Sequence, residues 1–155
     1  MLRRRECAIG LCGLGAPWAT ALCAATSPFG QWPAAQPRSA PLASDAANEK
    51  AYRRDAAAHL YSAFPDRVWH GRLPPLLHAV LVIDTEIDAR GAVRSLRVVR
   101  GPAGAKEVTP WVLGLMRRAA PLPPPRALGR VTYREVWLVH RSGRFQLDVL
   151  SEGQD

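Results

Sequence analysis

The sequence predicts an α+β domain in which two helices pack on a three- to four-stranded antiparallel sheet. Several short segments alternate apolar and polar residues, which is typical of strands with one buried face. Two other segments repeat apolar residues at helical spacing. A short Asp-x-x-Gly turn joins the first two strands directly, which makes that pair antiparallel.

The first two strands are predicted to form a hairpin. Its turn is Asp88 to Gly91, because the Asp side chain can accept hydrogen bonds from amides two residues on and Gly tolerates the positive φ of a tight loop. The return strand spans Val93 to Arg100. The odd positions of the first strand are predicted to face the core, namely Ala79, Leu81, Ile83, Thr85 and Ile87.

Two helices flank this hairpin in the sequence. The segment from Glu49 to Phe64 carries an apolar stripe and is followed by a proline. Thr109 is predicted to cap the second helix, with Pro110 as its first residue. This helix should end near Ala119, since the residue before Pro121 avoids the α conformation.

Two more strands are predicted after the second helix. Pro121 to Pro125 should form a stiff polyproline connector. Val131 to His140 is rich in β-branched and aromatic residues and is predicted to be the third strand. Apolar and polar residues alternate from Arg144 to Leu150, which predicts a final strand that covers an edge of the third one.

Residues 1–25 have the composition of a secretory signal peptide. Met1 to Arg5 is basic and Cys7 to Ala25 is uncharged. The alternative is an uncleaved membrane anchor, since the uncharged stretch nearly reaches the ~20 residues of a spanning helix, although its glycines and proline argue against this. All three cysteines lie in this segment, so cleavage would leave no disulfide, thiol nucleophile or cysteine metal site.

Residues 26–48 are rich in Pro, Ala and Ser, which predicts an extended linker before a domain at 49–155. The net charge of +8 and the pI near 10.4 are typical of proteins with anionic partners. We expect no nucleic-acid partner, because no segment alternates basic with aromatic residues as a stacking platform for single strands does.

No catalytic residues, cofactor or metal site are predicted. No two histidines show the i, i+4 spacing of a zinc enzyme, and no serine lies in a Gly-x-Ser-x-Gly motif. Asp84, Glu86 and Asp88 share a strand face that could hold a cation, but such alternation is more typical of a solvated face. A small envelope metal-binding protein or enzyme that uses this acidic face is one alternative.

Three segments, in this order and spacing, resemble the C-terminal domain of TonB and its relatives: Ile87 to Val93, Val98 to Arg100, and Met116 to Pro125. The resemblance covers residues 51–139. It implies two helices against a three-stranded antiparallel sheet, whose last strand accepts an extended peptide of an outer-membrane transporter. The chain departs from the family in lacking its long spacer of repeated Glu-Pro and Lys-Pro pairs, and in having a further strand that would cover the binding edge. Either this last strand peels away to admit a peptide, or the binding edge has moved to another strand.

The resemblance implies a periplasmic module that binds a strand of an envelope protein, such as a TonB-dependent transporter. The alternative is an energy transducer anchored in the inner membrane beside ExbB-ExbD-like partners. Edge strands also allow a homodimer. Arg118 can be explained structurally, because a cation at the end of a helix opposes the negative end of its dipole. The resemblance implies a second role, in which Arg118 binds a carboxylate of the bound peptide. The implied partner-binding residues are Tyr133, Arg134, Glu135, Val136, Trp137 and Arg118.

Overall fold

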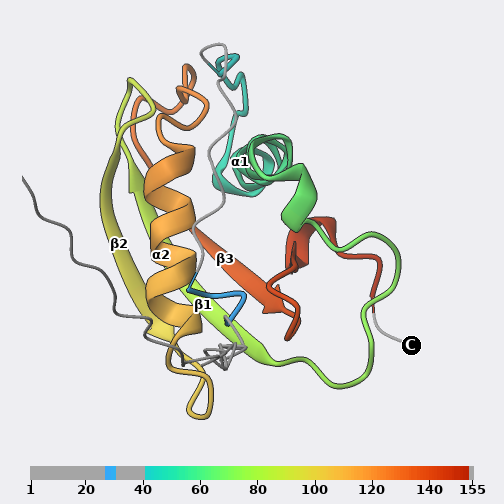
Figure 1. Ribbon diagram of the computed structural model, residues 1–155. Coiled ribbons are helices and arrows are strands. Elements are labelled where there is room, and N and C mark those ends of the chain that lie inside the picture. Colours follow the sequence, from blue (N-terminus) through green and yellow to red (C-terminus); the bar gives the residue numbers. More distant parts are fainter. Residues whose placement is uncertain (1–26, 31–40, 154–155) are drawn as a thin grey trace, which may run out of the picture.

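The computed structural model describes residues 27–30 and 41–153. Within these ranges four strands form one antiparallel sheet in the order β2-β1-β3-β4, and two helices lie on one of its faces (Figure 1). This confirms the α+β class. The elements, in chain order, are α1 (Glu49–Ala63), η1 (Pro65–Arg67), β1 (Ala79–Ile87), β2 (Val93–Arg100), α2 (Val108–Ala119), β3 (Val131–Val139), β4 (Phe145–Leu147) and η2 (Asp148–Leu150), where η marks a short 3-10 helix.

The hydrophobic core lies between the helices and one face of the sheet. α1 contributes Tyr52, whose ring meets that of Tyr133 edge-on, and α2 contributes Trp111, which packs against Phe145. The alternation predicted for β1 is confirmed, because every odd position from 79 to 87 is buried. In β3 the odd positions are buried as well, which leaves the even ones on the opposite face of the sheet.

The hairpin turn forms as the sequence predicts. The Asp88 carboxylate accepts hydrogen bonds from the backbone N–H groups of Arg90 and Ala92, at 2.9 and 3.0 Å. Gly91 has a φ of +83°, a conformation that side chains disfavour. Its N–H donates to the Asp88 carbonyl and its own carbonyl accepts from Leu122, at 2.8 Å. The turn is thereby held against the residues that follow α2.

The second helix begins earlier than the sequence predicts. Its first residue is Val108 and its N-cap is Glu107, whose side chain makes no capping hydrogen bond. Val108 is fully buried and its N–H donates to the Ala105 carbonyl, so burial draws the chain into a turn before the Thr-Pro pair. The predicted cap at Thr109 is therefore wrong, while the end at Ala119 is confirmed.

The last strand is shorter than predicted. β4 has three residues, and the chain then turns into η2 at Asp148. The Asp148 carboxylate accepts a hydrogen bond from Arg53 of α1 at 3.0 Å, which favours a turn toward the helix over continued pairing with β3. β4 therefore covers only Trp137 to Val139 of the neighbouring strand.

Two described parts of the predicted linker lie against the domain. Phe29 is buried between His78 and Trp111, with both ring centroids 5.3 Å away. Ser44 is also buried, and its N–H donates to the Pro124 carbonyl at 2.9 Å, while its carbonyl accepts from Arg126 at 3.0 Å. Backbone hydrogen bonds therefore hold the end of the proline run after α2 against Ser44.

Residues 1–26 and 31–40 lie outside the described part of the chain, and with them the predicted signal peptide and nearly half of the linker. In the described ranges, no helix combines the length and the apolar composition that crossing a membrane requires.

We predict that Gly91→Ala destabilises the protein by about 3 kcal/mol, because the added Cβ combines left-handed strain with a backbone clash. An ideal Cβ there would lie 2.0 Å from the Leu122 carbonyl oxygen. Gly129→Ala is the matched control, since its φ is +65° but its Cβ would meet open space. Urea denaturation of both variants measures the difference. Equal losses would mean that the contact between turn and connector contributes nothing.

Candidate functional site

The residues implied by the TonB resemblance lie on an interior strand of the sheet. β3 pairs along its whole length with β1, and its last three residues also pair with β4. Tyr133 and Trp137 face the core and are almost fully buried. Arg134 and Val136 lie on the opposite face of the sheet. The structure thus divides the five strand residues between two faces.

Glu135 lies at the part of β3 that β4 leaves uncovered. Its side chain is 2% exposed and accepts two hydrogen bonds from the Arg53 guanidinium of α1, at 3.1 and 2.7 Å. The same guanidinium donates to Asp148 of η2 at 3.0 Å. The Glu135 carboxylate also accepts a hydrogen bond from the backbone N–H of Val136, at 3.0 Å. An ion-paired side chain therefore occupies this edge of β3.

Burial and pairing act on Glu135 in opposite directions. Burial raises the pKa of the Glu135 carboxyl, and the hydrogen bonds from Arg53 counteract this shift. The hydrogen bond with Glu135 raises the pKa of Arg53, so the guanidinium stays charged. A buried carboxylate without its cation is costly, so the edge of β3 depends on Arg53.

The acidic face of β1 is occupied by arginines. The Asp84 carboxylate lies between Arg134 of β3, which donates to it at 2.6 and 3.0 Å, and Arg97 of β2. Hydrogen bonds from Arg134 chiefly hold the pKa of Asp84 below its usual value. Glu86 lies 3.4 Å from the Arg130 guanidinium, and Asp88 caps the hairpin turn. In residues 27–30 and 41–153, no three His, Cys, Asp or Glu side chains are grouped to hold a metal ion.

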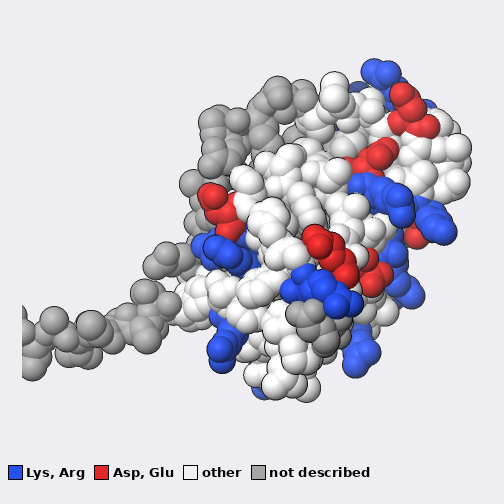
Figure 2. Space-filling model, turned by 90° about the vertical axis from the view of Figure 1, so that its right-hand side faces the viewer, with Lys and Arg blue, Asp and Glu red and all other residues white. Residues whose placement is uncertain are grey.

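The side of the molecule that faces away from β2 carries charges of both signs. Figure 2 shows Lys and Arg side chains next to Asp and Glu side chains in several places on this side. Independently of this view, the Arg53 guanidinium forms ion pairs with Glu135 of β3 and Asp148 of η2. Opposite charges thus compensate one another close to the β3–β4 side of the sheet.

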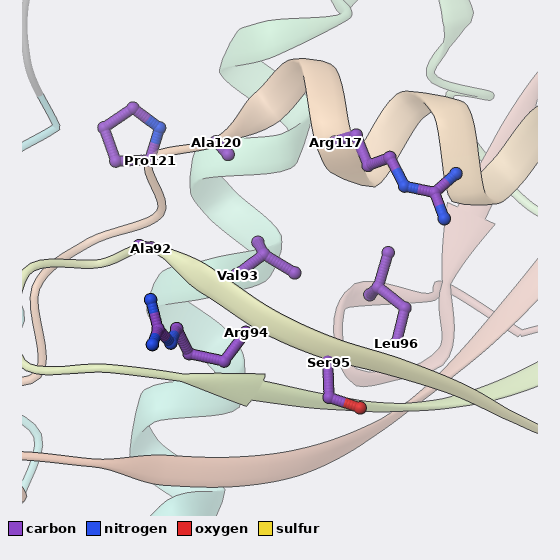
Figure 3. A pocket seen from close by; sticks show the side chains of 8 residues that line it. All are labelled: Ala92, Val93, Arg94, Ser95, Leu96, Arg117, Ala120 and Pro121. Atoms are coloured by element: carbon purple, nitrogen blue, oxygen red, sulfur yellow. The ribbon is translucent and has the colours of Figure 1, made fainter.

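Strand β2 forms the other edge of the sheet. It is the outermost strand at the end opposite β4, and no segment in the described part of the chain pairs with its outer side. A cleft of about 570 Å³ runs between β2 and the C-terminal end of α2. In Figure 3, Val93 and Leu96 point from the strand toward the helix and Ser95 points away. The walls include Arg117, Ala120 and Pro121 of the helix end.

Arg118, the candidate from α2, lies in the last turn of that helix next to Arg117, and both are exposed. Their cationic groups oppose the helix dipole at this position. Arg117 lines the cleft beside β2. The C-terminal end of α2 therefore lies near β2. The residues that line the cleft include none of the β3 residues that the TonB resemblance implies for partner binding.

Sequence reasoning missed the β2 edge, although one feature pointed to it. Arg94, Arg97 and Arg100 lie in one strand of eight residues. Charged residues at this density are typical of edge strands, because a strand flanked on both sides and covered on both faces cannot solvate them.

Comparison with known proteins adds no relative: no family model, no curated protein and no solved structure matches the chain. The two sheet edges are therefore the features from which a function can be inferred.

We predict that Arg53→Met lowers the free energy of unfolding by about 3 kcal/mol at neutral pH, because it leaves the Glu135 carboxylate buried without its cation. Met keeps most of the apolar stem, so lost packing contributes little. The neighbouring Arg54→Met, on an exposed residue, is the control. Urea denaturation measures both.

The loss in Arg53→Met should also depend on pH. A carboxyl whose folded pKa is raised stabilises the fold below its unfolded value, here the usual 4.5, and that stability disappears as the pH rises through the folded pKa. Without Arg53 the folded pKa of Glu135 rises further, so the deficit should shrink as the pH falls from neutral toward 4.5. A deficit that is equal at both pH values would contradict this role.

Proposed function

We propose that this protein is an exported binding module that captures an extended segment of another envelope protein by strand addition. One observation supports it above others: a sheet edge of eight residues lies unpaired, in the described part of the chain, next to a cleft. The exposed N–H and C=O groups of such an edge can pair with an incoming strand, and each net hydrogen bond contributes on the order of 1 kcal/mol.

The occupied carboxylates favour binding over catalysis or metal transport. The Asp84 carboxylate accepts hydrogen bonds from two arginines, and the Asp88 carboxylate accepts hydrogen bonds from two backbone N–H groups. Glu135 is bonded by Arg53. General base catalysis or cation binding would require at least one of these groups to give up a partner, which in the case of Glu135 destabilises the fold.

The proposed setting is the periplasm, and the proposed partner is an envelope protein such as a TonB-dependent outer-membrane transporter. The first 25 residues resemble a secretory signal peptide, and the segments around the hairpin and the second helix resemble the TonB C-terminal domain. Both features agree with a module that meets its partner outside the cytoplasm. An anchored transducer would use the same domain and differ in retaining residues 1–25.

The test is site-specific crosslinking in the cells that produce the protein. We expect a photoreactive amino acid at Arg117, which lines the cleft, to crosslink to an extended segment of one envelope protein. The same group at Arg141, an exposed residue at the turn after β3, is the control and should give no such product. Identical products from both positions, or products formed only with cytoplasmic proteins, would contradict the proposal.

A further inference from the structure

We infer that the outer edge of β2, and not that of β3, receives the partner strand, and that this strand alternates apolar residues with Asp or Glu. The inference rests on the proposed function and specifies its site and its ligand class. Three observations carry it: the direction of the backbone groups at the two edges, the apolar cleft on one face of β2, and the arginines on the other.

The hydrogen bonds at β3 fix which backbone groups point outward. Residues of an antiparallel strand point their N–H and C=O groups alternately to its two sides. The N–H of Val136 meets the Glu135 carboxylate and that of His140 meets the Arg144 carbonyl, so even positions of β3 point away from β1. The odd positions of β1 then face β3, and its even positions face β2.

The same alternation assigns the groups of β2. Asp84 is opposite Arg97 and Glu86 is opposite Ser95. Since even positions of β1 face β2, Arg97 and Ser95 point their backbone groups inward. The N–H and C=O groups of Leu96 and Val98 therefore point to the outer side, where no described segment pairs with them.

The edge of β3 is far less available. β4 covers its last three residues, and the Glu135 carboxylate takes up the outward N–H of Val136. A partner strand there would have to displace the Arg53–Glu135 pair from a buried position, whereas β2 requires no displacement within the described residues.

The two faces of β2 differ in chemistry. On the helix side, Val93 and Leu96 line the cleft together with Ala120 and Pro121 (Figure 3). A strand added to β2 would place every second side chain over this apolar surface. Apolar residues at those positions would gain burial.

The remaining side chains of the added strand would face arginines. Arg97 shares the outer face of the sheet with its pairing partner Asp84, and the exposed fraction of its side chain is 67%. Arg100 is opposite Val82 on that same face. In residues 27–30 and 41–153, Arg100 forms no ion pair. Acidic residues at alternate positions of the partner would therefore meet cations.

The same charges argue against a second copy of this chain as the occupant. An antiparallel pair of β2 strands would bring Arg94, Arg97 and Arg100 of one molecule next to those of the other. Like charges facing each other across paired strands are destabilising.

The test titrates the full chain with three soluble peptides in which valine alternates with glutamate, glutamine or lysine. Binding is followed by fluorescence of labelled peptide. We expect the glutamate peptide to bind at least about tenfold more tightly than the glutamine peptide, with a difference that falls as salt is added. The lysine peptide should bind more weakly than either.

Two proline variants identify the edge. Val98→Pro removes an outward N–H of β2, and Thr132→Pro removes an outward N–H of β3. Both N–H groups point away from β1, so neither substitution breaks a hydrogen bond between β1 and its neighbours. We expect Val98→Pro to weaken the glutamate peptide at least about fivefold, and Thr132→Pro to leave it unchanged. Circular dichroism checks that both variants fold.

A charge reversal on the outer face tests the acidic ligand class. Arg100→Glu should reduce affinity for the glutamate peptide at least about fivefold, because this cation lies on the face that the glutamate side chains would share. Arg141→Glu makes the same change in net charge at an exposed position outside β2 and should have a much smaller effect.

Several results would overturn the inference. Weakening by Thr132→Pro alone would move the site to β3 and leave the proposed function standing. Equal affinity for the glutamate and glutamine peptides, or no binding of any peptide, would show that the partner strand is not selected by acidic residues. The crosslinking at Arg117 tests the proposed function independently of this result. A dimer that Val98→Pro dissociates would make a second copy the occupant. If a single-stranded oligonucleotide bound more tightly than the peptides, and Val98→Pro did not weaken it, the arginines of β2 would instead form a nucleic-acid binding surface.

Discussion

The two edges of the sheet present backbone groups that need hydrogen-bond partners, and this need dominates the structure. Along the C-terminal half of β3 the partners come from β4 and from the Glu135 carboxylate, which is itself held by hydrogen bonds from Arg53 of α1. Along β2 the described part of the chain supplies no strand. Because β3 is covered at its C-terminal half and β2 is uncovered along its length in the described part of the chain, a partner strand can extend the sheet most readily at β2.

The closed edge also links the elements to one another. Arg53 joins α1 to β3 and η2, so that the first helix and the C-terminal segment share one cation. Phe145 and Leu147 of β4 are buried in the same core as Trp111 and Tyr52. A variant truncated before β4 would lose these core residues together with the edge cover, so β4 is part of the fold and cannot act as a removable flap.

Much of the fold could be predicted because its causes are local. The hairpin follows from alternation in β1 and from the Asp88 and Gly91 turn, all within neighbouring residues. The end of β4 could not be predicted, since it depends on a contact between Arg53 and Asp148, which lie 95 residues apart. Glu135 in the same way looks like a solvated strand residue until its partner, 82 residues away, is known.

The candidate site was harder to predict than the fold. The TonB resemblance directs attention to β3, and strand order in a sheet is not encoded by the periodicity of any one strand. The arginines of β2 were visible in the sequence, but their meaning depends on β2 being outermost. The cleft beside Val93 and Leu96 forms only when the end of α2 packs against that strand.

Amide hydrogen exchange of the free protein, resolved by residue, tests the difference between the edges most directly. Protection should alternate along β2, with fast exchange at Leu96 and Val98 and slow exchange at Ser95 and Arg97. Val136 should be protected by its bond to Glu135, and should lose that protection in Arg53→Met. Uniform protection along β2, together with fast exchange at Val136, would contradict the assignment of an open and a closed edge.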